Sequence, residues 1–435
     1  MGKKVKEIQF NFEIKNFVDT NNIVCCKRTQ TIYKYDETTG LFRPVDDIEL
    51  SKLIDEYIEH ISSDMLWSDY NMSIISKYVK TMAPYYDSMG RTGRIVFTNG
   101  TFNVEKRKLF RHSPKNRAIA GLEFAYDPTA TCPTFDRFIS QMADGDVDLQ
   151  MTLYEIAGYV AVGCKKACKL VILVSVGGSG KSVYLKIIEL LVGKDYTSNL
   201  SISEINNPSR AFDRCALLDS RLNIVHELGE KETLNSIFSA NVKKIVSGEE
   251  ISCEKKFGAR ISFIPEVSMI VVASNHSPSF ESMPSESIMR RTLILNITKT
   301  FSFEEQDPDL IKKLKKELPG IFNRALEYYD ILEQNHFVFA SEASSRAYID
   351  RQILETYPMY SFVKQHIISL PGNRLKTSDL RGAYSQWAAS RDIFVSANKG
   401  SVTKELETTI AACHYNFKAG GKSNGERYLE NLDVI

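Results

Sequence analysis

Residues 175–182, SVGGSGKS, combine three glycines with a lysine and hydroxyl side chains. A strand-like apolar run at 170–176 leads into this segment, and a helical pattern at 182–191 follows it. Glycines let successive backbone N–H groups turn toward an anion, and the helix N-terminus adds the positive end of its dipole. The segment therefore predicts a loop that binds the phosphates of a nucleoside triphosphate.

Two side chains of this loop have distinct expected roles. We expect Lys181 to contact the β- and γ-phosphate oxygens and Ser182 to ligate Mg²⁺. Ser175 stands where the usual pattern has its first glycine, and we expect Gly177 and Gly178 to supply the missing backbone freedom. The residues predicted to hold ATP are Gly177, Gly178, Ser179, Gly180, Lys181, Ser182 and Val183. The alternative is a Gly-rich turn without a ligand, which the strand and helix on either side disfavour.

A second chemical element is the strand-like segment LNIVHEL at residues 222–228, which ends in an acidic residue. Glu227 is placed to polarise the attacking water and, together with Ser182, to support Mg²⁺. His226 precedes it, so the strand delivers a single carboxylate. The alternative is a surface glutamate at the end of a strand.

Two more strand-like runs carry polar residues at their ends. Residues 269–275, MIVVASN, end in Asn275, and ligands bind beyond the carboxyl ends of strands in open α/β sheets. Asn275 is therefore predicted to sense the γ-phosphate, although a single Asn after a strand is usually a turn residue. Residues 289–295, MRRTLIL, place Arg290 and Arg291 before a strand. Arginine stabilises charge on a transferring phosphoryl group bound by a neighbouring subunit; a solvated basic pair is the alternative.

The elements that must position these residues are short buried strands with helices between them. The apolar runs lie at residues 170–176, 222–225, 261–264, 269–273 and 292–297. Such runs predict a mostly parallel sheet covered by helices. The expected fold class is therefore α/β, with a P-loop ATPase core.

The regions before and after the sheet have different sequence patterns. Before the sheet we expect a β element at 1–45, helices at 47–85, a hairpin with strands at 94–97 and 101–109, and helices at 135–142 and 149–162. After it we expect helices to about 334, then helices at 360–369, 377–390 and 401–412 and a hairpin within 415–431. Three helices followed by a hairpin are the outline of a winged helix-turn-helix.

Composition limits the class of protein. With 435 residues, 43% hydrophobic and 25% charged, the chain is long enough for several domains and is not mainly disordered. Its formal charge of +1 means that any nucleic-acid site is a local patch. The N-terminus does not resemble a signal peptide, and no apolar run approaches the roughly 20 residues that span a bilayer. We expect a cytoplasmic protein without a membrane partner.

The eight cysteines contain no Cys-x-x-Cys spacing, so a zinc ribbon is not expected. Cys164 and Cys168 are four residues apart and are predicted to share a helix face, but no second pair completes a metal site. We expect reduced, structural thiols.

The four segments GGSGKS (177–182), LNIVHEL (222–228), MIVVASN (269–275) and MRRTLIL (289–295) together resemble superfamily 3 helicases of the poxvirus-type and phage/plasmid primase-helicase group. IVFTNGTFNV (95–104), FAYDPTATCP (124–133) and EIAGY (155–159) resemble the domain that precedes the ATPase there, and residues 377–387 its winged-helix tail. The resemblance covers roughly residues 90–420. No primase domain fits before residue 90, so this is the helicase part alone.

The resemblance implies an ATPase core of the AAA+ type that assembles as a homo-hexameric ring around single-stranded DNA. It implies an ATP-dependent DNA helicase for replication of a phage, plasmid or genomic island, with ATP and Mg²⁺ as cofactors. A separate primase or initiator protein is an implied partner. The expected divisions are an N-terminal α+β region at 1–90, a helicase-preceding domain at 91–165, the ATPase at 166–340 and a winged helix at 345–435.

Two regions are candidates for contact with single-stranded or forked DNA. Residues 249–263 read as a hairpin whose tip carries Lys255, Lys256 and Phe257, which suit phosphate neutralisation and base stacking. An ordinary solvated hairpin is the alternative. In the winged helix the candidates are Lys404 on the recognition helix and Lys418, Lys422 and Arg427 on the wing. That module suits protein contacts as well.

Two other classes of function stay open at this stage. A DNA-binding replication initiator would use the same ATP site as a switch without motor activity. A P-loop kinase would need a lid and a substrate base near the loop, and it gives no role to Asn275, Arg290 or Arg291.

Overall fold

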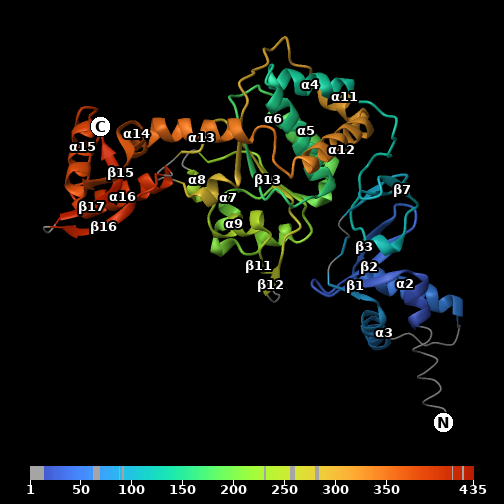
Figure 1. Cartoon of the computed structure of the whole chain (residues 1–435). Coiled ribbons are helices and arrows are strands. Elements are labelled where there is room, and N and C mark those ends of the chain that lie inside the picture. Colours follow the sequence, from blue (N-terminus) through green and yellow to red (C-terminus); the bar gives the residue numbers. More distant parts are fainter. Residues whose placement is uncertain are drawn as a thin grey trace.

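The computed structural model describes residues 14–61, 69–87, 89–90, 93–229, 232–254, 260–279, 284–413, 415–423 and 426–435. A helix-covered central sheet lies between an N-terminal unit, blue in Figure 1, and a C-terminal unit, red in Figure 1. These two units lie at opposite ends of the molecule.

The N-terminal unit is built on a four-stranded sheet of order β3-β2-β1-β4. Its strands are β1 (Ile23–Cys26), β2 (Thr31–Asp36), β3 (Leu41–Val45) and β4 (Tyr85–Tyr86), with helices α2 (Asp47–Ile61) and α3 (Asp69–Met82). The β element predicted over 1–45 is confirmed for residues 23–45, whereas residues 14–20 are helical and residues 1–13 lie outside the described part of the chain. The predicted helices are confirmed over 47–61 and 69–82, and the prediction of helix is wrong at Tyr85, where β4 begins.

A small three-stranded sheet follows, made of β5 (Arg94–Phe97), β6 (Gly100–Asn103) and β7 (Lys108–Phe110). The prediction of one return strand over 101–109 is wrong, because the chain turns between β6 and β7. Arg107 has φ +50° in that turn, a left-handed conformation that interrupts an extended strand.

The central sheet has five strands in the order β14-β8-β13-β10-β9, and every pairing in it is parallel. The strands are β8 (Leu170–Val174), β9 (Thr197–Ser198), β10 (Leu222–Val225), β13 (Met269–Ser274) and β14 (Thr292–Asn296). The predicted parallel sheet is confirmed. The apolar run at 261–264 is not part of it, because its residues lie mostly in β12 (Arg260–Phe263), which pairs antiparallel with β11 (Ile251–Glu254). That pairing confirms the two hairpin arms expected within residues 249–263.

Alternate residues of the sheet face two different cores. Val171 and Leu173 belong to a core shared with α4 (Pro133–Ala143), α5 (Val147–Val162), α6 (Lys181–Val192) and α12 (Leu318–Gln334). Leu170 and Ile172 belong to a second core on the other face, which includes residues of α7 (Ile202–Asn206), α8 (Leu234–Ile237), α9 (Ala240–Ser247) and α13 (Glu342–Thr356). Shorter helices are α10 (Glu286–Met289), before β14, and α11 (Leu310–Lys316), before α12.

Gly158, in the segment EIAGY, lies where α5 and α12 approach closely. A Cβ atom at this position would lie 2.1 Å from the carbonyl oxygen of Ala325. A side chain here would therefore push the two helices apart, and the close packing of α5 on α12 requires glycine.

The C-terminal unit combines helices with a three-stranded sheet. It contains α14 (Pro358–His366), β15 (Ile367–Lys376), α15 (Thr377–Ala389), α16 (Lys399–Ala412), β16 (Lys418–Ser423) and β17 (Glu426–Val434), with sheet order β15-β17-β16. The predicted helix over 360–369 is wrong after His366, because β15 begins at Ile367. Ile367 and Ile368 are β-branched, and Pro371 and Gly372 follow them, which favours an extended strand over a helix.

In the part of the chain that the structure describes, the cysteines form no disulfide. Cys164 and Cys168 do not share a helix face, because Gly163 ends α5 with φ +72° and both cysteines follow it. Within the described residues there is no group of three or more His, Cys, Asp or Glu side chains arranged to hold a metal ion. In the same part of the chain, no helix combines the length and the apolar character needed to cross a membrane.

Candidate functional site

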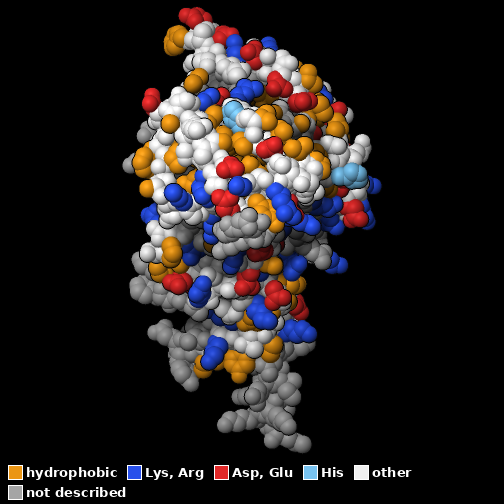
Figure 2. Space-filling view, turned by 60° about the vertical axis from the view of Figure 1, so that its left-hand side comes forward, with side chains coloured by type: hydrophobic (Ala, Val, Ile, Leu, Met, Phe, Trp, Pro, Cys, Tyr) orange, Lys and Arg blue, Asp and Glu red, His pale blue; other side chains and the backbone are white. Residues whose placement is uncertain are grey.

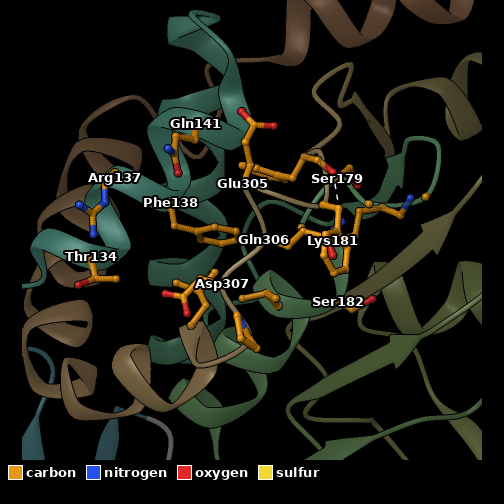
Figure 3. A pocket seen from close by; sticks show the side chains of 18 of the residues that line it. Thr134, Arg137, Phe138, Gln141, Ser179, Lys181, Ser182, Glu305, Gln306 and Asp307 are labelled. Carbon is orange, nitrogen blue, oxygen red and sulfur yellow. Dashed lines mark hydrogen bonds between the residues drawn. The ribbon is translucent and has the colours of Figure 1, made fainter.

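A cavity of about 920 Å³ opens at the carboxyl end of β8 (Figure 3). On one side it is lined by residues 177–183, which are the loop after β8 and the first turn of α6. On the other side it is lined by α4 and by the segment at 301–310. Asn275, directly after β13, completes the lining near the loop.

The loop adopts backbone conformations that favour glycine. Gly178 and Gly180 have φ values of +80° and +86°, in the left-handed region. A Cβ at Gly180 would also lie 2.9 Å from the Phe138 ring, so this glycine lets α4 close over the loop. The helix α6 begins at Lys181, so its unpaired N–H groups lie at the loop, where an anion can accept from them.

Lys181 is buried, and its ammonium is held by neutral oxygens. Its Nζ donates to the carbonyl oxygen of Ser175 at 2.6 Å, to the Ser175 hydroxyl, and to Oδ1 of Asn275 at 3.2 Å. Burial lowers the pKa of Lys181, because a poorly solvated site disfavours the charged form. A phosphate in the cavity would supply the negative charge that these neutral partners lack.

Ser175 has a role of its own in the loop. Its backbone N–H continues the pairing of β8 with β13 by donating to the carbonyl of Ser274 at 3.1 Å. Its hydroxyl lies 2.5 Å from the Ser179 hydroxyl and also accepts from Lys181. The position therefore lies in strand register and needs no glycine conformation. Of the two glycines expected to compensate, Gly178 is left-handed and Gly177 is not.

Glu227 and Asn275 reach the same edge of the sheet. The strand β13 lies between β8 and β10, and Leu228 N–H donates to the carbonyl of Ala273 at 3.1 Å, so the chain after β10 stays beside β13. Glu227 is exposed and does not line the cavity, whereas Asn275 lines it. The structure thus brings Asn275 to Lys181 and leaves Glu227 outside the cavity wall.

Arg290 and Arg291 lie at the opposite edge of the sheet. Thr292 pairs with Leu170, the first residue of β8, so the length of that strand separates the arginines from the loop, roughly 16 Å at the rise of a β-strand. Neither side chain is among the residues that line the cavity of its own chain.

The two arginines differ in their contacts. Arg291 Nη1 donates to the carbonyl and hydroxyl oxygens of Ser287, at 2.9 and 2.6 Å. Arg290 is exposed and has no side-chain partner among the described residues. Of this pair, Arg290 is the more exposed, and Arg291 is partly buried and folded back on Ser287.

The DNA-contact candidates are only partly visible. Lys255, Lys256 and Phe257 lie outside the described residues, although both arms of their hairpin are described. Lys404 and Lys418 are exposed, and Lys422 belongs to β16. Arg427 forms an ion pair with Glu407 at 3.0 Å and is not free for a phosphate. On the face shown in Figure 2, Lys and Arg side chains are interspersed with Asp and Glu.

Part of the cavity was not anticipated from the sequence. The α4 residues Thr134, Arg137, Phe138 and Gln141 line it, as do Phe301, Phe303, Glu305, Gln306, Asp307, Pro308 and Leu310 (Figure 3). A hydrogen bond of 2.9 Å from Phe301 N–H to the carbonyl of Gly178 holds the second group against the loop. A local sequence signal for these residues is weak, because both groups reach the loop through packing between segments that are distant in the chain.

Two family models match separate parts of the chain. Residues 15–144 match the family described as D5 N terminal like, and residues 173–291 match a family of unknown function, DUF5906. The second match includes the loop, Glu227, Asn275 and both arginines. The first match supports a D5-like protein.

Solved structures share the fold over almost the whole chain. One apo structure of the NrS-1 C terminal region (305-718) is 9% identical, with a TM-score of 0.51, and the match covers 97% of this chain and 99% of that one. Another apo structure of the same region is also 9% identical with a TM-score of 0.51, covering 94% and 96%. At this identity the likeness concerns the fold alone.

Proposed function

We propose that this chain is an ATP-dependent DNA helicase of superfamily 3, acting in replication of a phage, plasmid or genomic island. The observation that carries the proposal is the contact of buried Lys181 with Asn275 at the rim of the Gly-rich loop. A phosphate-binding cation and an amide at the ends of neighbouring strands suit the binding and hydrolysis of a nucleoside triphosphate. The D5 N terminal like match supports the same direction.

The cavity fits Mg²⁺-ATP. Its loop end offers backbone N–H groups, Lys181 and the Ser182 hydroxyl to the phosphates and the metal. Its other end offers the Phe138 ring and the amide of Gln141 to the base and ribose. When bound, Mg²⁺ neutralises charge on the phosphates, and Ser182 and Glu227 are the residues that would hold it.

The chain's own residues divide the reaction between them. Lys181 binds the phosphates. When its Nζ donates to a phosphate oxygen instead of to Asn275 Oδ1, the Asn275 amide becomes free to sense the γ-phosphate. Glu227 acts as the base for the attacking water. Because its exposed side chain lies beside β13 and outside the cavity wall, the proposal includes a rotation of this side chain toward the cavity.

A ring of AAA+ type subunits completes the site. Arg290 is at the wrong edge of the sheet for its own nucleotide, so we assign it to the nucleotide of a neighbouring subunit. Six subunits is the number that the resemblance to superfamily 3 implies.

Contact with DNA is assigned to the hairpin tip and to the C-terminal unit. Lys255, Lys256 and Phe257 would follow a single strand in the pore, and Lys404, Lys418 and Lys422 would bind duplex DNA as a winged helix. The order helix, strand, two helices and two strands in the C-terminal unit supports the second assignment.

Strand separation on a forked duplex with Mg²⁺-ATP tests the proposal directly. Wild-type protein should separate the strands, and Glu227→Gln should bind ATP without turnover. Lys256→Ala and Phe257→Ala should keep basal ATPase activity and lose unwinding. ATP hydrolysis and DNA binding with no strand separation would favour the ATP-switched initiator, and absence of ATP binding would overturn both readings.

A further inference from the structure

The helix α13 connects the central sheet to the C-terminal unit (Figure 1). It packs beside β14, where the Ser345 hydroxyl accepts from Ile294 N–H at 2.8 Å. Ile349 and Ile353 of α13 belong to the core on that face of the sheet. The helix is therefore part of the ATPase body and not a loose linker.

The start of α13 is fixed to α5 by buried polar contacts. Ser341 N–H donates to Oγ1 of Thr152 at 2.8 Å, and Ala340 N–H donates to Oε2 of Glu155 at 3.0 Å. Thr152, Glu155 and Ser341 are all buried. A helix anchored in this way holds its first turns in a fixed place relative to the sheet.

From this fixed position α13 holds both ends of the short helix α10, whose C-cap residue is Arg290. Glu286, in the first turn of α10, accepts from both terminal nitrogens of Arg346, at 3.1 and 3.2 Å. At the other end, Lys169 Nζ donates to the carbonyl oxygen of Arg290 at 2.7 Å and to Oε2 of Glu342 at 2.8 Å. Lys169 is 8% exposed, so this bridge is shielded from water.

These contacts act on the backbone around Arg290 and leave its guanidinium without a partner among the described residues. A two-point clamp of this kind fixes the direction in which the side chain leaves the subunit. A free arginine on an unclamped four-residue helix would lose conformational freedom each time it met a phosphate.

We propose that α13 positions Arg290 for the neighbouring subunit's nucleotide, with Arg346, Glu342 and Lys169 as the positioning residues. The inference rests on the proposed function, because it assumes that Arg290 acts in trans. It adds that the competence of one subunit to hydrolyse ATP depends on a helix of the next.

The test uses full-length Arg346→Met and, separately, Glu286→Gln, each of which breaks the exposed ion pair. We expect kcat for ATP to fall about 3- to 30-fold, in the range reported for residues that couple to a site without touching its ligand. KM for ATP should stay within about twofold, because each nucleotide is held by its own loop. The charge exchange Glu286→Arg with Arg346→Glu should recover turnover. Lys80→Met, which breaks a similar exposed pair with Asp47 in the N-terminal unit, is the matched control and should leave kcat unchanged.

A double variant separates positioning from a structural effect. If α13 acts through Arg290, then Arg290→Ala combined with Arg346→Met should be no slower than Arg290→Ala alone. Losses that multiply would overturn the inference, as would an unchanged kcat in both Arg346→Met and Glu286→Gln while Arg290→Ala is slow. An Arg290→Ala variant with full turnover would instead overturn the trans assignment. If Arg346→Met fails to fold, Glu286→Gln and the charge exchange still decide.

Discussion

The two ends of the strands in the central sheet, their carboxyl edge and their amino edge, differ in how the cations beside them are buried and hydrogen-bonded. At the carboxyl edge, Lys181 is buried and held by the oxygens of Ser175 and Asn275. At the amino edge, Arg290 is exposed; its backbone carbonyl accepts from Lys169 and its backbone N–H donates to Glu286, but its guanidinium has no partner among the described residues. One edge therefore has a cation prepared for an anion within the same chain, and the other presents a cation outward.

This difference follows from parallel strands. In a parallel sheet every strand end of one kind lies at one edge, so residues before β14 cannot meet residues after β8 in the same molecule. A site that needs both cations therefore has to be assembled from two copies.

Replacing Lys181 with Ala should have the largest effect. Among the described residues, Lys181 is the only cation that lines the loop end of the cavity. Its loss should lower the rate of ATP hydrolysis about 1,000-fold or more. Phosphate release at saturating ATP measures it, with folding checked by circular dichroism. Lys186→Ala is the control, since Lys186 lies on the same helix and pairs with Glu189 at 2.7 Å. Equal losses in the two variants would mean that the helix, not the cavity, was damaged.

In the same assay, the alanine variants of Arg290 and Arg291 should differ in their rates of ATP hydrolysis. Arg290→Ala should lower turnover about 100-fold with little change in ATP binding, because the proposed function assigns its side chain to the transition state of a neighbouring subunit's reaction. Arg291→Ala should keep turnover within a few-fold and reduce stability by about 1 kcal/mol, since it loses its hydrogen bonds to Ser287.

Mixing subunits sharpens this prediction. Rings that contain both Arg290→Ala and Lys181→Ala subunits should regain part of the wild-type rate, because an intact Lys181 can face an intact Arg290 across one interface. If mixed rings form and no activity returns, Arg290 acts within its own chain or only structurally, and the comparison of the two edges loses its functional meaning.

The anchor of α13 predicts a pH dependence of stability. Burial raises the pKa of Glu155 to about 7; the Ala340 N–H partly opposes this, and the charges of Glu342 and Asp148 add to the rise. Glu342 is in turn paired with Lys169. Because the folded pKa lies above the unfolded value of 4.5, the stability from this group is present below pH 4.5 and is lost as pH rises through 7.

Glu155→Gln should remove the loss of stability at high pH, because Gln does not ionise, and it keeps an oxygen that can accept from Ala340 N–H. Its free energy of unfolding, measured in urea, should exceed that of wild type at pH 8 by on the order of 3 kcal/mol and should match it at about pH 4. A constant difference between the variants across this pH range would show that Glu155 does not titrate there.

Ser175→Gly should have the smallest effect. The change restores the usual first glycine of the loop but removes the hydroxyl that bonds Lys181 and Ser179. Loss of one hydrogen-bonding group should raise KM for ATP about 2- to 10-fold. A lower KM would show that the glycine freedom matters more than the hydroxyl.

Local sequence patterns were sufficient for several features of this protein. The Gly-rich loop, the helix that follows it and four of the five strands of the central sheet were predictable, because glycine conformations and runs of apolar residues act over a few positions; the two-residue strand β9 was not predicted. The hairpin arms within 249–263 were predictable for the same reason. The strand β15 was missed, since Ile367 and Ile368 continue the apolar pattern of the preceding helix.

Only the tertiary structure decided which of the candidate residues meet. Sequence could not show that Asn275 bonds Lys181 while Glu227 stays outside the cavity, because strand order joins β13 to β8 and not β10 to β8. It also could not distinguish Arg290 from its neighbour Arg291, since the difference lies in which side chain folds back on its own helix.

The same holds for the far wall of the cavity and for the clamp on Arg290. The wall is made by α4 and residues 301–310, and the clamp by Lys169 and α13, all of them distant in the chain from the groups they serve. Residue types and short spacings specify local backbone and the chemistry on offer. Which of those groups share a site depends on contacts between distant segments, and these exist only once the sheet and its two cores have formed.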